Sequence, residues 1–141
     1  MSDVERLVAF FESMTPGSVS EIDAHYANEA YFKDPFNEVR GIESVRRVFA
    51  HMFDQVAEPR FKVTERIVAV NGAFLTWDFT FRFRPGGASV TVHGASHLRF
   101  DAEGKVAYHY DYWDAAGELY AKVPVLGALM RLAGRRLSAG R

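Results

Sequence analysis

The N-terminal part of the chain places apolar residues at the period of a helix. Ser2 and Glu5 form a capping-box pattern ahead of an apolar series that recurs every three to four residues. This pattern predicts a first amphipathic helix over residues 3–14, and Pro16-Gly17 ends it.

Two more helices and a short strand are predicted before residue 60. Ser18 starts a second capping pattern, which predicts a short helix containing Tyr26. Residues 30–34 then predict a short strand ended by Pro35, and Gly41 precedes a third helix. The apolar face of that third helix consists of Val45, Val48, Phe49, Met52 and Phe53.

After Arg60 the period changes to two, as expected for strands with alternating faces. Asn71-Gly72 predicts a type I′ hairpin turn between the first two strands. The predicted strands cover residues 61–70, 73–84, 89–101 and 106–113. One face of the second strand is a wall of four aromatic residues, Trp77, Phe79, Phe81 and Phe83.

This element order predicts an α+β fold. We expect a cone-shaped, curved antiparallel sheet wrapped around three N-terminal helices, with a ligand site at the open end of the cone. Residues 1–114 would form this domain, and residues 115–141 a C-terminal amphipathic helical extension.

Composition narrows the function classes. The 141 residues suit one domain. The 17 Lys and Arg residues are balanced by 18 Asp and Glu residues, so the chain has no net positive charge that would attract nucleic acid. The chain has no cysteine, no apolar run long enough to cross a membrane, and charged residues in the N-terminal segment where a signal peptide would be apolar. We therefore expect a soluble, cytoplasmic protein.

The last predicted strand carries the clearest candidate chemistry. His109, Asp111 and Trp113 alternate onto one face, which places an imidazole, a carboxylate and a flat aromatic ring side by side. The opposite face holds Tyr108, Tyr110 and Tyr112. One face predicts a ligand cup and the other a packing or subunit contact.

Two short motifs and the element order over residues 3–114 resemble the nuclear transport factor 2-like superfamily, which includes ketosteroid isomerases, SnoaL-type polyketide cyclases and scytalone dehydratase. The motifs are Lys33-Asp34-Pro35 and Ser96-His97-Leu98-Arg99-Phe100 followed by Gly104-Lys105-Val106. By this resemblance Asp34 falls on the isomerase general base. Ser96 and Phe10 fall on its two oxyanion donors, an aspartic acid and a tyrosine, and Phe49 falls on a supporting tyrosine.

Together these features predict a small cofactor-free enzyme, an isomerase, cyclase or dehydratase, acting on an apolar substrate that bears a carbonyl group. Asp34 or Asp111 would be the base, and His109 the acid or the orienting group. The alternative is a non-catalytic carrier or interaction module that holds a hydrophobic ligand. An epoxide hydrolase is less favoured, because Arg99 is predicted to face away from the cup. The substrate-binding residues would be Phe10, Met14, Phe49, Trp77, Phe79, Phe81, Ser96, Leu98 and Trp113.

Each candidate also has a structural interpretation. Asp34 before Pro35 is typical of a turn start, and His109 with Asp111 can be a mutually satisfied buried pair. The aromatic wall can be ordinary core. No HxH or HExxH pattern occurs, so we expect no metal site.

The remaining surfaces predict protein contacts. The tyrosine face would form a homodimer, or the chain's own C-terminal segment would cover it. Residues 126–137 carry an apolar stripe opposite Arg131, Arg135 and Arg136. We expect this segment to cap the cone mouth or to pack on the dimer partner, and not to lie on a membrane.

Overall fold

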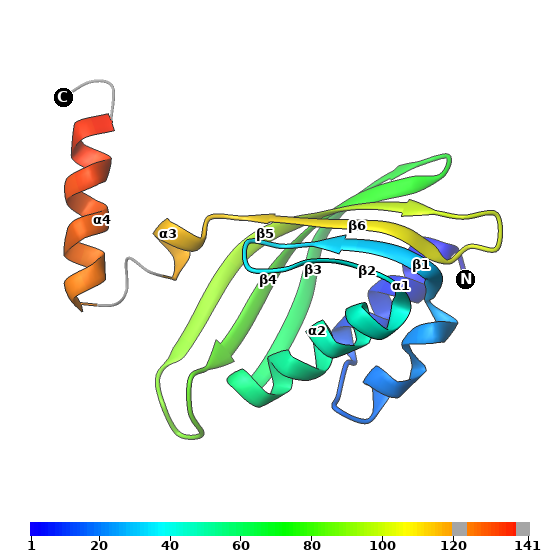
Figure 1. Cartoon of the computed structure of the whole chain (residues 1–141), viewed down its shortest axis with the longest axis horizontal. Coiled ribbons are helices and arrows are strands. Elements are labelled where there is room, and N and C mark those ends of the chain that lie inside the picture. The colour runs from blue at the N-terminus through cyan, green and yellow to red at the C-terminus, as the bar shows by residue number, and fades with distance from the viewer. Residues whose placement is uncertain (120–123, 138–141) are drawn as a thin grey trace.

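The computed structural model describes residues 1–119 and 124–137. Six strands form one curved sheet in the order β2-β1-β6-β5-β4-β3, and the N-terminal helices lie inside its curve (Figure 1). The helices are α1 (Asp3–Glu12), the 3-10 helix η1 (Ser18–Ala24), α2 (Ile42–Gln55), α3 (Ala115–Glu118) and α4 (Pro124–Leu137). The strands are β1 (Tyr26–Lys33), β2 (Glu38–Arg40), β3 (Ala57–Ala69), β4 (Gly72–Arg82), β5 (Ser89–Phe100) and β6 (Val106–Trp113).

The predicted α+β class is confirmed, but the sheet is mixed. Strands β3 to β6 are antiparallel neighbours, whereas β1 runs parallel to β6, with Phe32 opposite His109. The backbone N–H of Val106 donates to the carbonyl of His25 at 2.8 Å, where the two strands begin side by side. Parallel pairing requires a long connection, and the segment from β2 to β5 supplies it. The fully antiparallel sheet of the prediction is therefore wrong at β1.

The second predicted helix is shorter than expected. Residues Ser18–Ala24 form η1, but Tyr26 already belongs to β1. The strand β2, which pairs with the end of β1, was not predicted. Its three residues are too few to show a period in the sequence.

The hairpin between β3 and β4 is confirmed, but its turn is not type I′. The turn residues are Val70 and Asn71, and neither has the positive φ that type I′ requires. Gly72 instead pairs with Arg99 on β5. A Cβ atom at Gly72 would collide with the carbonyl oxygen of Leu98, so close strand approach explains this glycine.

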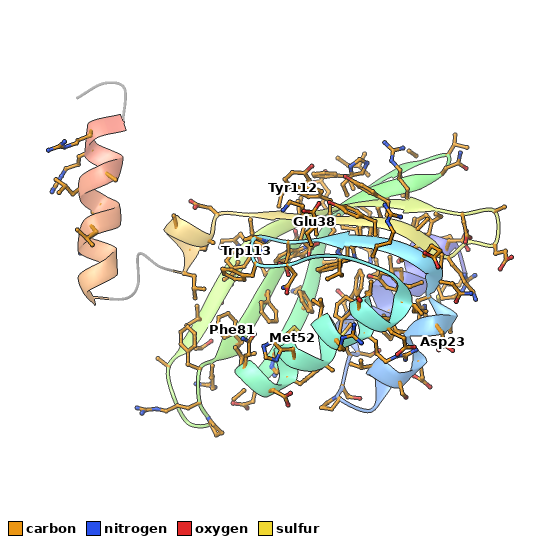
Figure 2. All side chains as sticks on the ribbon, viewed as in Figure 1. Asp23, Glu38, Met52, Phe81, Tyr112 and Trp113 are labelled. Atoms are coloured by element: carbon orange, nitrogen blue, oxygen red, sulfur yellow. The ribbon has the colours of Figure 1, made fainter. Side chains whose placement is uncertain are left out.

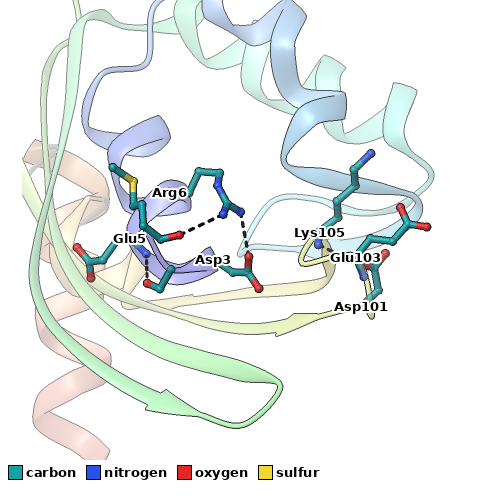
Figure 3. Close-up of polar contacts among 8 residues, drawn as sticks. Asp3, Glu5, Arg6, Asp101, Glu103 and Lys105 are labelled. Atoms are coloured by element: carbon teal, nitrogen blue, oxygen red, sulfur yellow. Dashed lines mark hydrogen bonds and ion pairs between the residues drawn. The ribbon is translucent and has the colours of Figure 1, made fainter.

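Helix α1 anchors the narrow end of the cone. The Ser2 hydroxyl accepts the N–H of Glu5 at 3.1 Å, as the capping pattern predicted, and Arg6 pairs with Asp3 at 2.9 Å (Figure 3). Asp3 lies against Gly104 in the turn between β5 and β6. The helix start is thereby fixed on the turn that leads into β6.

Helix α2 lies across the concave face of the sheet, as predicted. Val45 and Phe49 on its inner face are buried, and Val48, Met52 and Phe53 pack around the core. One wall of the cone is therefore helical and the other is sheet.

The C-terminal helix does not cap the cone. Helix α4 stands apart from the sheet in Figure 1, and none of its described residues lines the cavity below. Leu129 and Ala133, two members of the predicted apolar stripe, are exposed. The division at residues 114 and 115 stays a prediction. Within residues 1–119 and 124–137, no helix is both long and apolar enough to cross a membrane.

Candidate active site

A cavity of about 620 Å³ opens between α2 and the concave face of the sheet. Figure 2 shows Trp113, Phe81 and Met52 around it, with Tyr112 on the opposite side of the sheet. Its walls are mainly aromatic, and its only carboxylates among the described residues are Asp34 and Asp111. The wall is formed by Phe32, Asp34, Phe36, Asn37, Val48, Phe49, His51, Met52, Gln55, Val56, Phe61, Trp77, Phe79, Phe81, Phe83, Val92, Asp111, Trp113 and Leu119.

Asp34 both forms a turn and faces the cavity. Its Oδ1 accepts the backbone N–H groups of Phe36 at 2.8 Å and Asn37 at 2.7 Å. Burial raises the pKa of Asp34 above its ordinary value, these hydrogen bonds partly oppose the shift, and the charge of Asp111 adds to it. The turn and the cavity site therefore use the same side chain.

Asp111 is held from behind by two donors. Its Oδ1 accepts the Ser96 hydroxyl at 2.5 Å and lies 2.6 Å from Nε2 of His109. The Trp77 indole N–H can only donate, and it reaches Ser96 Oγ at 2.9 Å, so Ser96 must direct its own proton to Asp111. No hydrogen bond engages Oδ2 within the described part of the chain, which leaves this oxygen available at the cavity wall.

His109 lies behind Asp111 and does not line the cavity. Its Nδ1 is 2.6 Å from the hydroxyl of Tyr26, which is fully buried. Burial raises the pKa of Tyr26 well above its ordinary value, so the phenol keeps its proton and can donate it. A neutral His109 with its proton on Nε2 satisfies both contacts.

The hydrogen bonds therefore form one chain that ends at a carboxylate oxygen. It runs from Trp77 through Ser96 on one side and from Tyr26 through His109 on the other, and both branches meet at Oδ1 of Asp111. His109 orients Asp111 in this arrangement, which matches one of the two predicted roles. It does not line the cavity, so it is not placed to donate a proton to a ligand as the other predicted role requires.

The position of Trp77 depends on a glycine. Gly94 lies opposite Trp77 in the pairing of β4 with β5, and a Cβ atom there would collide with the indole ring. The absence of a side chain lets the indole lie over the backbone of β5 and reach Ser96.

Seven of the predicted site residues line the cavity, namely Asp34, Phe49, Trp77, Phe79, Phe81, Asp111 and Trp113. Ser96 and His109 belong to the hydrogen-bond chain behind it. Their side chains share a face with the lining residues, as predicted, but they lie deeper in the cone.

Three predicted substrate contacts are elsewhere. Phe10 stacks on His25 at 4.2 Å between ring centroids, and Leu98 is fully buried in the core. Met14 borders a separate groove between α1 and β3. Since the cone narrows toward α1, side chains at that end fill it and leave no room for a ligand.

Several residues of the site were not predicted. Tyr26 was placed in a helix, and His51 and Gln55 lie on α2 outside the apolar face that the helical period selected. The turn residues Phe36 and Asn37 carried no periodic signal. Only the Asp34-Pro35 turn pointed to that part of the chain.

The outer face of the sheet carries the predicted tyrosines. Tyr110 stacks on Tyr112 at 4.3 Å between ring centroids, and Arg99 lies over Tyr108, away from the cavity as predicted. Lys33 also lies on this face, with its Nζ 5.9 Å from the centre of the Tyr110 ring. Asp34 and Asp111 also border a shallow groove on this side. The homodimer through the tyrosine face stays a prediction.

The family model of the SnoaL-like domain matches residues 7–109, which is most of the cone. The chain belongs to the SnoaL-like domain family. The predicted resemblance to the superfamily is thereby confirmed. No curated protein matches this SnoaL-like chain significantly.

Solved structures share the fold at low sequence identity. A putative SnoaL-like polyketide cyclase from Jannaschia sp. CCS1 has a TM-score of 0.71 and 16% identity, covering 82% of this chain and 87% of its own. An LEH-like epoxide hydrolase from M. tuberculosis has a TM-score of 0.68 and 15% identity, and the match covers 92% of this chain and 93% of that protein's chain. A protein with a ketosteroid isomerase-like fold from Catenulispora acidiphila, in complex with trimethylamine, has a TM-score of 0.69 and 15% identity. The match covers 83% of this chain and 88% of that protein's chain.

Proposed function

We propose that this SnoaL-like protein is a cofactor-free acid/base enzyme that moves a proton next to the carbonyl group of an apolar ring substrate. The observation that carries the proposal is the pair of carboxylates, Asp34 and Asp111, on the wall of one aromatic cavity. A carboxylate in apolar surroundings is a stronger base than one in water, because burial destabilises its charge.

Asp111 is better placed than Asp34 to act as the base. Its Oδ1 is held by Ser96 and His109, which leaves Oδ2 for the C–H bond that reacts. Asp34 gives its Oδ1 to two backbone N–H groups of its own turn, and is suited to return the proton or to position the substrate. In the reaction Oδ2 of Asp111 takes a proton from the carbon beside the carbonyl, an enolate forms, and the proton is returned at the same or another carbon.

The enolate oxygen needs a hydrogen-bond donor, and Phe10 and Ser96 do not supply one at the cavity wall. The wall offers His51, Gln55 and Trp113 as polar groups, whereas the Asn37 amide already donates to Asp34 at 3.1 and 3.2 Å. An amide or indole N–H donates without changing its charge, so a donor of this kind stabilises the enolate and consumes no proton.

The test follows deuterium incorporation and needs no knowledge of the natural substrate. The protein is incubated in D₂O with 2-tetralone, a bicyclic ketone with acidic C–H bonds beside its carbonyl, and exchange is followed by proton NMR. We expect exchange above the buffer rate, with Asp111→Asn losing at least about 100-fold, since acid/base groups contribute on this scale. Asp78→Asn on the outer face is the matched control and retains the rate.

The carrier function remains the second candidate, because the cavity lacks the isomerase's tyrosine and aspartic acid donors. It predicts tight binding of apolar ligands with no exchange above buffer in any variant. Exchange that is unchanged in both Asp34→Asn and Asp111→Asn would contradict the enzyme proposal.

A further inference from the structure

The wall of the cavity combines negative charge with aromatic rings and contains no lysine or arginine among the described residues. Its acidic groups are Asp34 and Asp111. The wall also carries His51 of α2. Its two carboxyl groups are therefore accompanied by one imidazole and by no lysine or arginine among the described residues.

No basic side chain from elsewhere neutralises this charge inside the cavity. Lys33 precedes Asp34 in the sequence and borders the shallow outer groove together with both carboxylates, but its Nζ lies over Tyr110 on the outer face and it does not line the cavity. Arg99 lies on the same outer face over Tyr108. Ser96 and His109 give hydrogen bonds to Asp111 from behind and leave the cavity side of the carboxylate open.

The two carboxylates on the cavity wall repel one another. Burial and the charge of Asp111 both raise the pKa of Asp34, so the ionised form of Asp34 is disfavoured there. A positive charge bound between them would remove this repulsion.

The aromatic walls determine which kind of cation fits. Phe36 meets Trp113 edge to face at 5.5 Å between ring centroids, and Phe61 stacks on Phe79 at 4.4 Å, so ring faces and edges border the same space as the carboxylates. Aromatic rings attract large, weakly hydrated organic cations, whereas hard metal ions prefer several oxygen ligands. Within residues 1–119 and 124–137, no three His, Asp or Glu side chains are grouped to hold a metal ion.

We infer that the substrate or ligand of this cavity carries an organic ammonium group, a tertiary or quaternary amine attached to an apolar body. Asp34 and the aromatic rings bind the ammonium group, and Asp111 is left to act on the rest of the molecule. This inference rests on the proposed function for the role of Asp111, but the recognition of a cation is independent of any reaction.

The chain offers a direct optical readout. It contains two tryptophans, Trp77 and Trp113, and both line the cavity, so intrinsic tryptophan fluorescence reports on this site. Phenyltrimethylammonium and tert-butylbenzene are a matched pair of probes, because they have the same shape and differ only in charge. Both are titrated into the full chain at pH 8, with isothermal calorimetry as the second measurement.

We expect phenyltrimethylammonium to bind at least as tightly as tert-butylbenzene. Asp34→Asn and Asp111→Asn should each weaken the cation about tenfold, and change the neutral probe less than about twofold, because a buried charge pair is lost in one case only. Asp78→Asn should change neither. If one of the two cavity variants fails to fold, the other gives the same comparison.

Equal losses for both probes, or binding of the neutral probe alone, would overturn the inference. The deuterium exchange of 2-tetralone separates this outcome from a failure of the proposed function. Preferential binding of the cation without deuterium exchange would support the ammonium site and contradict the enzyme proposal. Deuterium exchange without preferential binding of the cation would support the enzyme proposal and contradict the ammonium site.

Discussion

Nε2 of His109 lies 2.6 Å from Oδ1 of Asp111, and this buried pair has an exposed counterpart on the other face of the sheet. There Nδ1 of His93 lies 2.5 Å from Oδ1 of Asp78. The side chain of His109 is 3% exposed and that of His93 is 67% exposed. The same two residue types thus form one pair in the core and one in water, which gives an internal control for the role of burial.

Replacing the two histidines by phenylalanine should therefore give very different losses of stability. His109→Phe leaves the buried Tyr26 hydroxyl without an acceptor, and the free energy of unfolding should fall by about 2–4 kcal/mol. His93→Phe should change it by less than about 0.5 kcal/mol, as is usual for an exposed pair. Urea unfolding measures both, and equal effects would contradict the account.

Tyr26→Phe tests the other end of the hydrogen-bond chain. It leaves Nδ1 of His109 unpaired in the core and should cost about 1–2 kcal/mol, whereas Tyr112→Phe on the exposed face should be neutral. In the double variant with His109→Phe, the added cost of Tyr26→Phe should disappear, because the partner is already gone. Fully additive losses would show that the two side chains are not coupled.

The role of Tyr26 was not predicted from the sequence, because it depends on the pairing of two strands that are far apart along the chain. The predicted capping pattern at Ser18 was wrong in detail, since the N-cap of η1 is Gly17 and no side chain caps it. The pattern marked only the short turn of η1, and the helical period of so short a segment could not show where it ends. Tyr26 meets His109 because β1 runs parallel to β6, a pairing with more than 70 residues between the strands. Local periodicity contains no information on such a pairing.

Alternation along long strands was more informative. It correctly placed His109, Asp111 and Trp113 on the concave face and the three tyrosines on the outer face. It gave no depth within the cone, so Leu98 on β5 was predicted to contact the ligand although it is fully buried in the core. Phe10 and Met14, at the first helix, were also predicted as ligand contacts, Phe10 from the family resemblance, and they too lie away from the cavity. Depth depends on the curvature of the sheet, which no single strand determines.

Gly94→Ala should disturb the site without touching a polar group. The added methyl collides with the Trp77 indole and should separate its N–H from Ser96, at a cost of about 1–3 kcal/mol typical of overpacking. The fluorescence of Trp77 should shift as well. Gly134→Ala in α4 meets no atom within 4 Å and should be neutral or slightly stabilising. An unchanged emission spectrum in Gly94→Ala would show that the indole does not depend on this glycine.

The titration of Asp34 tests whether the two carboxylates share one environment. Asp111→Asn removes a negative charge that raises the pKa of Asp34, so that pKa should fall, as followed by carbon NMR of the side-chain carboxyl. Asp78→Asn is the control and should leave it unchanged. A pKa of Asp34 that does not respond to Asp111→Asn would place the two groups in separate environments.

The same shift has a consequence for stability. Since the folded-state pKa of Asp34 lies above its ordinary value of 3.8, its favourable contribution is complete below pH 3.8 and is lost as the pH rises through the folded pKa. Asp34→Asn keeps an oxygen for the turn and removes the buried charge. The variant should therefore be more stable than the wild type at pH 8, and this difference should shrink as the pH falls toward 3.8. A difference that does not vary with pH would contradict the assigned shift.

The proposed acid/base chemistry is tested by the rate at which the protein exchanges the acidic C–H protons of 2-tetralone in D₂O, compared between the wild type and the double variant Asp34→Asn/Asp111→Asn. Both side chains keep their size in this variant, and circular dichroism checks that the fold is retained. We expect exchange above the buffer rate in the wild type and exchange at the buffer rate in the double variant. A folded double variant that exchanges as fast as the wild type would show that the two carboxylates do not perform the chemistry.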